Sequence, residues 1–184
     1  MKIKTIASGS KGNCSIVLCD ETNFIIDMGI SYLTLKKSLE ENSLSFDHFT
    51  GILITHNHKD HVNGLASVVK KTKLPVFIPM EMYDGIKELV PKERCTFIDD
   101  NFNINDVKIE LIHTSHDAPY SVGFIINCAD KSIVYVTDTG YINRKYLNKM
   151  ISAKDTEFIK VITGVRRSGK STLMLMFKDY LLSN

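Results

Sequence analysis

The chain has 184 residues, of which 43% are hydrophobic and 24% are charged, and its net charge is +2. This composition is typical of a globular protein in solution, and no apolar run approaches the about 20 residues that a membrane-spanning helix needs. The first residues, MKIKTIASGSKGN, contain no apolar stretch of the kind that export signals have. The four cysteines form no C-x-x-C pair. We therefore expect a cytoplasmic protein with reduced, mostly buried thiols and no membrane contact.

Strands and helices alternate along the first part of the chain. Short apolar runs bounded by turn residues predict strands, and apolar residues at helical spacing predict helices. The predicted strands are 2–7, 15–19, 23–27, 51–55, 75–78, 107–113, 121–128 and 132–138. The predicted helices are 31–42, 60–73 and 80–90. This alternation indicates an α/β protein.

The charge composition of the sequence changes near residue 142. Residues 142–184 carry nine Lys and Arg against three Asp and Glu, a net charge of +6, whereas residues 1–141 carry a net charge of −4. A basic helix, a strand at 158–163, a glycine-rich loop and a final helix are predicted in this tail. The sequence thus predicts two parts, residues 1–141 and residues 142–184. The acidic balance of the first part indicates no basic groove there.

The segment T-H-N-H-K-D-H has the highest density of potential metal ligands in the chain. His56, His58, Asp60 and His61 follow directly on a strand that is predicted to be buried. Two histidines two residues apart in an extended loop project to the same side, so both imidazoles can meet one ion. A carboxylate beside imidazoles suits Zn, Mn or Fe better than a closed structural zinc site, which thiolates dominate. A solvated loop with incidental histidines is the alternative.

Three further segments join this one in a family resemblance. Asp27 ends the strand NFIID before Met-Gly, His116 lies in HTSHDAPYSVGF, and Asp138 lies in IVYVTDTG. With the histidine segment and the turn SGSKGN, residues 1–141 resemble the metallo-β-lactamase fold superfamily. They are most similar to its bacterial single-domain phosphodiesterases with DNA exonuclease character. The resemblance implies a four-layer αββα sandwich and a metal-dependent hydrolase acting on a phosphodiester substrate such as DNA.

The resemblance also implies a role for each residue of a site with two divalent ions, Zn or Mn. The first ion would be held by His56, His58 and His116, the second by Asp60 and His61, and both by Asp138. The predicted catalytic residues are Asp60 and His61, and Asp60 would position the water that attacks. Asp27 would orient a ligand histidine from behind.

Two features depart from the family pattern. No histidine follows His116, although the superfamily has a fifth motif with a histidine on the second metal. The family fold also runs beyond about 200 residues, with two βαβ halves that stack face to face. We therefore expect a C-terminally truncated domain whose second metal site binds weakly. An inactive metal-binding fragment stays open as an alternative.

The tail contains a complete phosphate-loop pattern, G-V-R-R-S-G-K-S at 164–171. In such loops backbone N–H groups wrap a phosphate, the lysine reaches the β- and γ-phosphates and the hydroxyl binds Mg²⁺. The residues concerned are Gly164, Gly169, Lys170, Ser171 and Thr172. The tail resembles the N-terminal Walker A segment of bacterial AAA-like P-loop ATPases, so the sequence predicts a chimaera. ATP-binding is the alternative function, without turnover because no strand with a Walker B acid follows. No specific protein partner is predicted.

Overall fold

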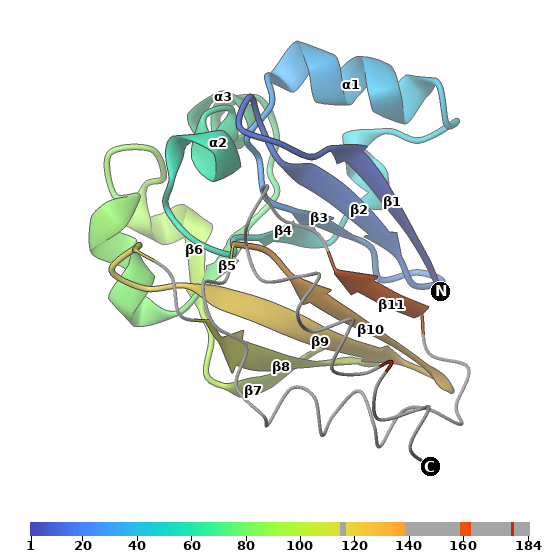
Figure 1. Cartoon of the computed structure of the whole chain (residues 1–184). Helices are drawn as coiled ribbons and strands as arrows, with labels where there is room; N and C mark the ends of the chain where they lie inside the picture. Colours follow the sequence, from blue (N-terminus) through green and yellow to red (C-terminus); the bar gives the residue numbers. More distant parts are fainter. Residues whose placement is uncertain (115–116, 139–158, 163–177, 179–184) are drawn as a thin grey trace.

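The strands of the protein form two sheets that lie one above the other (Figure 1). The structure is a computed structural model, and it describes residues 1–114, 117–138, 159–162 and 178. The first sheet has six strands in sequence order: β1 (Lys2–Ala7), β2 (Cys14–Leu18), β3 (Phe24–Ile26), β4 (Gly51–Leu53), β5 (Val76–Ile78) and β6 (Cys95–Phe97). Its first three strands pair antiparallel, and β3 to β6 pair parallel.

The second sheet has five strands in the order β11-β10-β9-β8-β7. Its strands are β7 (Asn101–Ile104), β8 (Val107–His113), β9 (Val122–Cys128), β10 (Lys131–Val136) and β11 (Ile159–Ile162). Strands β7 to β10 form an antiparallel meander, while β11 pairs parallel to β10, with Ile133 opposite Ile159. The strand predicted in the tail therefore extends the second sheet. The division of the chain at residue 141 stays a prediction.

Three α-helices lie on the outer face of the six-stranded sheet (Figure 1). They are α1 (Tyr32–Glu40), α2 (Lys59–Val62) and α3 (Leu65–Lys71). Helix α1 begins where the Ser31 hydroxyl accepts a hydrogen bond from the Thr34 N–H at 3.1 Å. It turns Leu35 and Leu39 into the core and leaves Leu33 exposed. Shorter 3₁₀ helices are η1 (Phe46–His48), η2 (Met80–Gly85) and η3 (Lys92–Arg94).

The hydrophobic core lies between the two sheets. One cluster of buried side chains combines residues of β2 to β5 with residues of β8 to β10. Tyr135 of β10 is 1% exposed, and its hydroxyl donates to the Ser15 hydroxyl of β2 at 3.4 Å, across the sheets. Cys14, Cys19 and Cys128 are buried, and all four cysteines are free thiols, as predicted. Within the described ranges no helix is long and apolar enough to cross a membrane.

The helix predicted at 60–73 is in fact two helices, because the backbone turns at Asn63 and Gly64. The Gly64 N–H donates to the Met28 carbonyl at 2.8 Å. A Cβ at Gly64 would lie 1.9 Å from the carbonyl oxygen of Ile30, so only glycine allows this approach. The break brings α2, which carries Asp60 and His61, against the loop that follows β3.

The prediction of an α-helix at 80–90 was also wrong, since the segment forms η2 and turns. Gly85 lies in the middle of the segment and packs against the side chain of Asn57, where a Cβ would meet Nδ2 at 2.3 Å. Strands β6 and β7 were not predicted. Both are short, and the outward residues Asn101 and Asn103 of β7 give no apolar signal.

Candidate metal centre

Buried side chains that follow strands of both sheets meet a histidine of α2 at one point. Asp27 follows β3 and His56 follows β4, and the two strands are parallel, so both residues lie at the same edge of the first sheet. Asp138 follows β10 of the second sheet. Among the described residues, His56, His61 and Asp138 form a group whose ligand atoms all lie within 4.8 Å of one another. All three side chains are buried.

Asp27 holds the loop and one ring of this group in place. Its carboxylate accepts hydrogen bonds from the Thr55 N–H at 2.8 Å and from the Thr55 hydroxyl at 2.9 Å. Its Oδ2 lies 2.8 Å from Nδ1 of His61. A carboxylate cannot donate, so the His61 ring presents Nδ1–H to Asp27 and turns Nε2 toward the other members of the group. Asp27 takes a positive φ of 60°, where a side chain is uncommon.

His61 lies between two carboxylates, since its Nε2 is 2.8 Å from Oδ2 of Asp138. Burial opposes the charged ring, but the carboxylates of Asp27 and Asp138 outweigh it and raise the pKa of His61 to about 10. In the metal-free protein His61 is therefore an imidazolium that bridges the two carboxylates. An ion at this point would replace the Nε2 proton.

His56 completes the buried group. Its Nδ1 lies 3.1 Å from the Thr55 hydroxyl, and its Nε2 lies 3.7 Å from Oδ2 of Asp138. The ring centroids of His56 and His61 are 4.0 Å apart. Thr55 thus contacts both rings and Asp27, and this small side chain fixes the mutual orientation of three members of the site.

Asn13 is a site residue that the sequence reasoning missed. Its Nδ2 lies 2.9 Å from Nε2 of His61 and donates to Oδ2 of Asp60 at 3.0 Å. Its backbone N–H donates to the Asp60 carbonyl at 2.6 Å. Asn13 is the last residue of the turn SGSKGN, which was noted only as part of the family resemblance. The turn was the sequence signal that could have identified Asn13, because a glycine-rich turn before a strand can bring a side chain close to a site.

The backbone around the site is too close for larger residues. A Cβ at Gly29 would lie 1.7 Å from the carbonyl oxygen of Asp60. Gly12 has a φ of +147°, and a Cβ there would lie 2.7 Å from the carbonyl oxygen of Gly29. The turn SGSKGN, the loop after β3 and the start of α2 therefore pack backbone against backbone.

The remaining predicted residues lie around this group or outside the described residues. Asp60 is close, with Oδ2 3.5 Å from Nε2 of His61. The side chain of His58 is 37% exposed, its ring centroid is 4.8 Å from that of His56, and its Nε2 lies 3.8 Å from Asp117. His116 lies outside the described residues. The nucleotide-binding residues Gly164, Gly169, Lys170, Ser171 and Thr172 also lie outside them.

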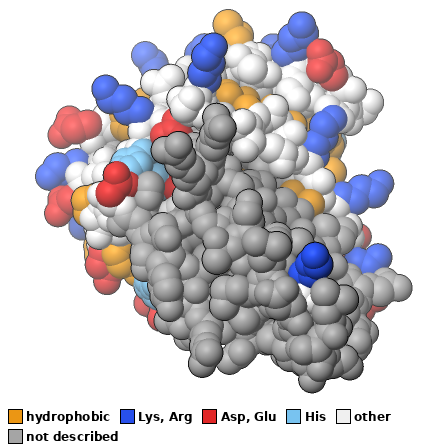
Figure 2. All heavy atoms as spheres, in the orientation of Figure 1, with side chains coloured by type: hydrophobic (Ala, Val, Ile, Leu, Met, Phe, Trp, Pro, Cys, Tyr) orange, Lys and Arg blue, Asp and Glu red, His pale blue; other side chains and the backbone are white. Residues whose placement is uncertain are grey.

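The donor atoms suit a divalent ion. Two imidazoles and one carboxylate in a buried group match the nitrogen and oxygen ligands of catalytic zinc and manganese sites. No cysteine among the described residues belongs to this group, and burial raises the pKa of the Cys14 thiol and raises that of Cys19 to about 12. Figure 2 shows histidine surface beside acidic side chains on the left of the molecule.

The fold and this site agree with what comparison with known proteins finds. The family model described as "Beta-lactamase superfamily domain" matches residues 22–161, so the chain belongs to that family. A metallo-β-lactamase of Cronobacter sakazakii is similar in structure, with a TM-score of 0.66 and 14% identity over 97% of this chain and 83% of that one. The metallo-β-lactamase fold that the sequence predicted is therefore confirmed.

Curated relatives are similar in sequence as well. The chain is 28% identical over 148 residues to Exodeoxyribonuclease YycJ of Bacillus anthracis, over 78% of this chain and 56% of the relative. It is 28% identical over 149 residues to Exodeoxyribonuclease WalJ of Streptococcus pneumoniae, over 77% of this chain and 55% of the relative. The chain thus spans about half the length of these curated relatives.

Proposed function

We propose that the protein is a metal-dependent hydrolase of phosphodiester bonds in DNA, of the exonuclease type. The observation that carries this proposal is the buried group of His56, His61 and Asp138 with Asp27 behind it. Two histidines and two carboxylates are rarely buried together in a protein unless they form a functional site. DNA as the substrate rests on the two relatives named as exodeoxyribonucleases.

Each residue has a defined part in this proposal. His56, His58 and His116 would hold one divalent ion, Asp60 and His61 a second, and Asp138 both. The ions, Zn or Mn, would lower the pKa of bound water toward neutrality and offset negative charge on the phosphoryl oxygen. Asp27 keeps the His61 ring turned so that Nε2 is available, and Asn13 orients the carboxylate of Asp60. Asp60 would accept a hydrogen bond from the attacking water.

The second ion is expected to bind more weakly than the first. Only three ligand residues are assigned to it, and His61, one of these, must give up a proton whose pKa is about 10. ATP binding gains no support from the comparisons, so it is not part of the proposal. The four free cysteines favour the cytoplasm as the location.

A hydrolysis assay tests the proposal. The purified chain is incubated with Zn²⁺ or Mn²⁺ and either 5′-labelled single-stranded DNA or bis(p-nitrophenyl) phosphate, with and without a chelator. We expect metal-dependent hydrolysis that falls by at least about 100-fold in His58→Ala. His58 is partly exposed, so this variant should fold. His48→Ala, which removes an exposed histidine outside the metal site, is the matched control. Activity that survives chelation or His58→Ala would overturn the proposal.

A further inference from the structure

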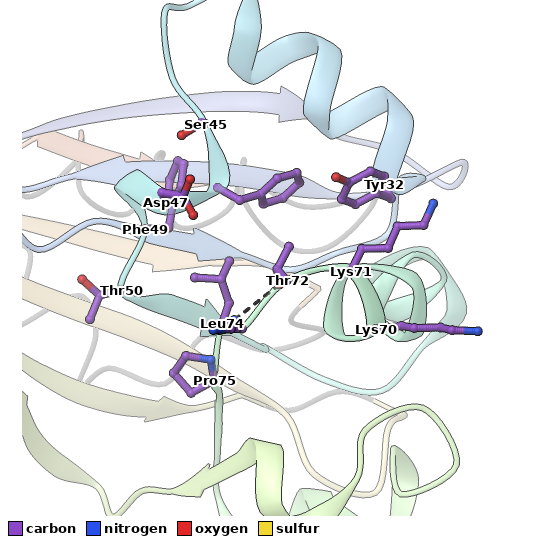
Figure 3. Close-up of a pocket in the computed structure, with 12 residues that line it drawn as sticks. Tyr32, Ser45, Asp47, Phe49, Thr50, Lys70, Lys71, Thr72, Leu74 and Pro75 are labelled. Carbon is purple, nitrogen blue, oxygen red and sulfur yellow. Dashed lines mark hydrogen bonds between the residues drawn. The ribbon is translucent and has the colours of Figure 1, made fainter.

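A groove of about 870 Å³ lies at the other end of the first sheet from the metal site (Figure 3). It is bounded by the start of α1, by η1 and the residues that lead into β4, and by the segment from the end of α3 to β5. Phe49 and Thr50 line it and precede β4, whereas His56 follows β4. The groove is therefore a second feature of the surface, separate from the metal centre.

Lysines dominate the charge of this groove. Lys70, Lys71 and Lys73 line it and are exposed, and Asp47 is the only acidic residue among its described lining residues. None of the three lysines takes part in an ion pair within the part of the chain that the structure describes. The lysines of α1 differ, because Lys36 pairs with Glu40 at 3.6 Å. Three exposed ammonium groups against one carboxylate leave this groove positive, although residues 1–141 carry a net charge of −4.

An aromatic pair fixes one of these ammonium groups. The rings of Tyr32 and Phe46 stack at a centroid distance of 5.0 Å and an interplanar angle of 8°. The Nζ of Lys71 lies 4.5 Å from the centroid of the Tyr32 ring, and Figure 3 shows this side chain extending toward the ring. A cation–π contact holds the ammonium in one place. Lys71 therefore loses less side-chain entropy when it binds an anion than a free lysine would.

We infer that this groove binds the phosphate backbone of single-stranded nucleic acid at a distance from the metal centre. A positively charged groove that follows the backbone is a common feature of proteins that bind single strands with little regard to sequence. Lys70, Lys71 and Lys73 supply the positive charge for the phosphates, and the Tyr32 ring, stacked on Phe46, holds the Lys71 ammonium beside them. The inference rests on the proposed function, because DNA as the substrate makes a second strand contact useful. Such a contact holds long substrates and leaves the chemistry of short ones unchanged.

Binding of a hydrolysis-resistant strand tests this groove. Fluorescence anisotropy follows a labelled phosphorothioate oligothymidylate with the full chain at about 50 to 200 mM salt. The variant Lys70→Ala, Lys71→Ala, Lys73→Ala is compared with Lys36→Ala, Lys37→Ala, Lys87→Ala. The control removes the same charge from three lysines that are each paired with a nearby carboxylate.

The groove variant should bind about tenfold more weakly at the lowest salt, and its salt slope should fall by about 2, since each single-strand phosphate contact contributes about 0.7. The control should keep the slope of the original chain. Equal loss in both variants would overturn the inference, because the lysines would then act only through net charge. Capture by anionic lipid vesicles without binding of the strand would also overturn it.

Two further measurements separate this inference from the proposed function. Tyr32→Leu removes the ring below Lys71 and should weaken strand binding about threefold, while Tyr32→Phe keeps the ring and should not. Hydrolysis of bis(p-nitrophenyl) phosphate should be unchanged in the groove variant. If the chain hydrolyses this compound but the groove variant binds DNA normally, the inference fails and the hydrolase stands. If the groove binds DNA but no hydrolysis occurs, the proposed function fails alone.

Discussion

Replacing Asp27 by asparagine tests how the protein orients its central histidine. The carboxylate accepts from the Thr55 N–H at 2.8 Å and from Nδ1–H of His61 at 2.8 Å, with one oxygen for each. The amide of Asp27→Asn offers one oxygen and one NH₂ group. Its one oxygen can accept from the Thr55 N–H or from Nδ1–H of His61 but not from both, and its NH₂ favours the ring tautomer with the proton on Nε2. That tautomer has no lone pair for an ion at Nε2.

The expected loss can be stated in two ways that agree. One hydrogen bond to a charged group contributes about 1.5–3 kcal/mol. Removing a carboxylate that supports a ligand histidine lowers metal affinity by about 10- to 100-fold. This is about 1.4–2.7 kcal/mol. We therefore expect Asp27→Asn to bind Zn²⁺ at the site that His61 serves about 10- to 100-fold more weakly than the original chain.

A chelator-competition titration measures this difference. The matched control is Asp100→Asn, because Asp100 makes the same kind of contact with His113, at 2.7 Å, on the surface. The control should bind Zn²⁺ like the original chain. Equal affinity of Asp27→Asn and Asp100→Asn would refute the idea that the Asp27 contact controls the His61 ring.

Three other predictions concern the metal site and helix α1. Gly29→Ala places a Cβ 1.7 Å from the Asp60 carbonyl oxygen. It should lower the free energy of unfolding by about 1–3 kcal/mol in chemical denaturation; an unchanged midpoint would contradict the close packing. Because His61 has a pKa of about 10 in the metal-free chain, metal binding must release its proton. The affinity for the second Zn²⁺, which His61 is proposed to hold, should therefore rise by about tenfold per pH unit between about pH 6 and 8, and a flat pH profile would contradict this charge state. Leu35→Ala should cost about 2–5 kcal/mol, while Leu33→Ala, at a side chain that is 68% exposed, should stay within about 0.5 kcal/mol. Thermal unfolding of the two variants checks this contrast.

The sequence predicted the strands and the metal motif where a local pattern was strong. Strand β8 has the predicted bounds because its apolar residues are bounded by turns on both sides. The motif of His56, His58, Asp60 and His61 is dense enough to stand out in any chain. These features depend on neighbours in sequence, so they can be read without the fold.

Other features depend on contacts between distant segments, which no local pattern carries. Asn13 reaches Asp60 across 47 residues, and the break in the helix at Gly64 arises from contact with the loop after β3. The basic groove was not predicted either, because the net negative charge of residues 1–141 conceals a local group of lysines. Average composition cannot show how the fold distributes charge over its surface.

The central claim is that a divalent ion binds at the buried group, held by Asp138 together with His56 or His61. Anomalous X-ray scattering from crystals grown with Zn²⁺ locates that ion directly. The predicted result is an anomalous peak about 2.0–2.2 Å from Nε2 of His56 or His61 and from the carboxylate of Asp138. Crystals saturated with Zn²⁺ whose peaks all lie away from these three side chains would contradict the account.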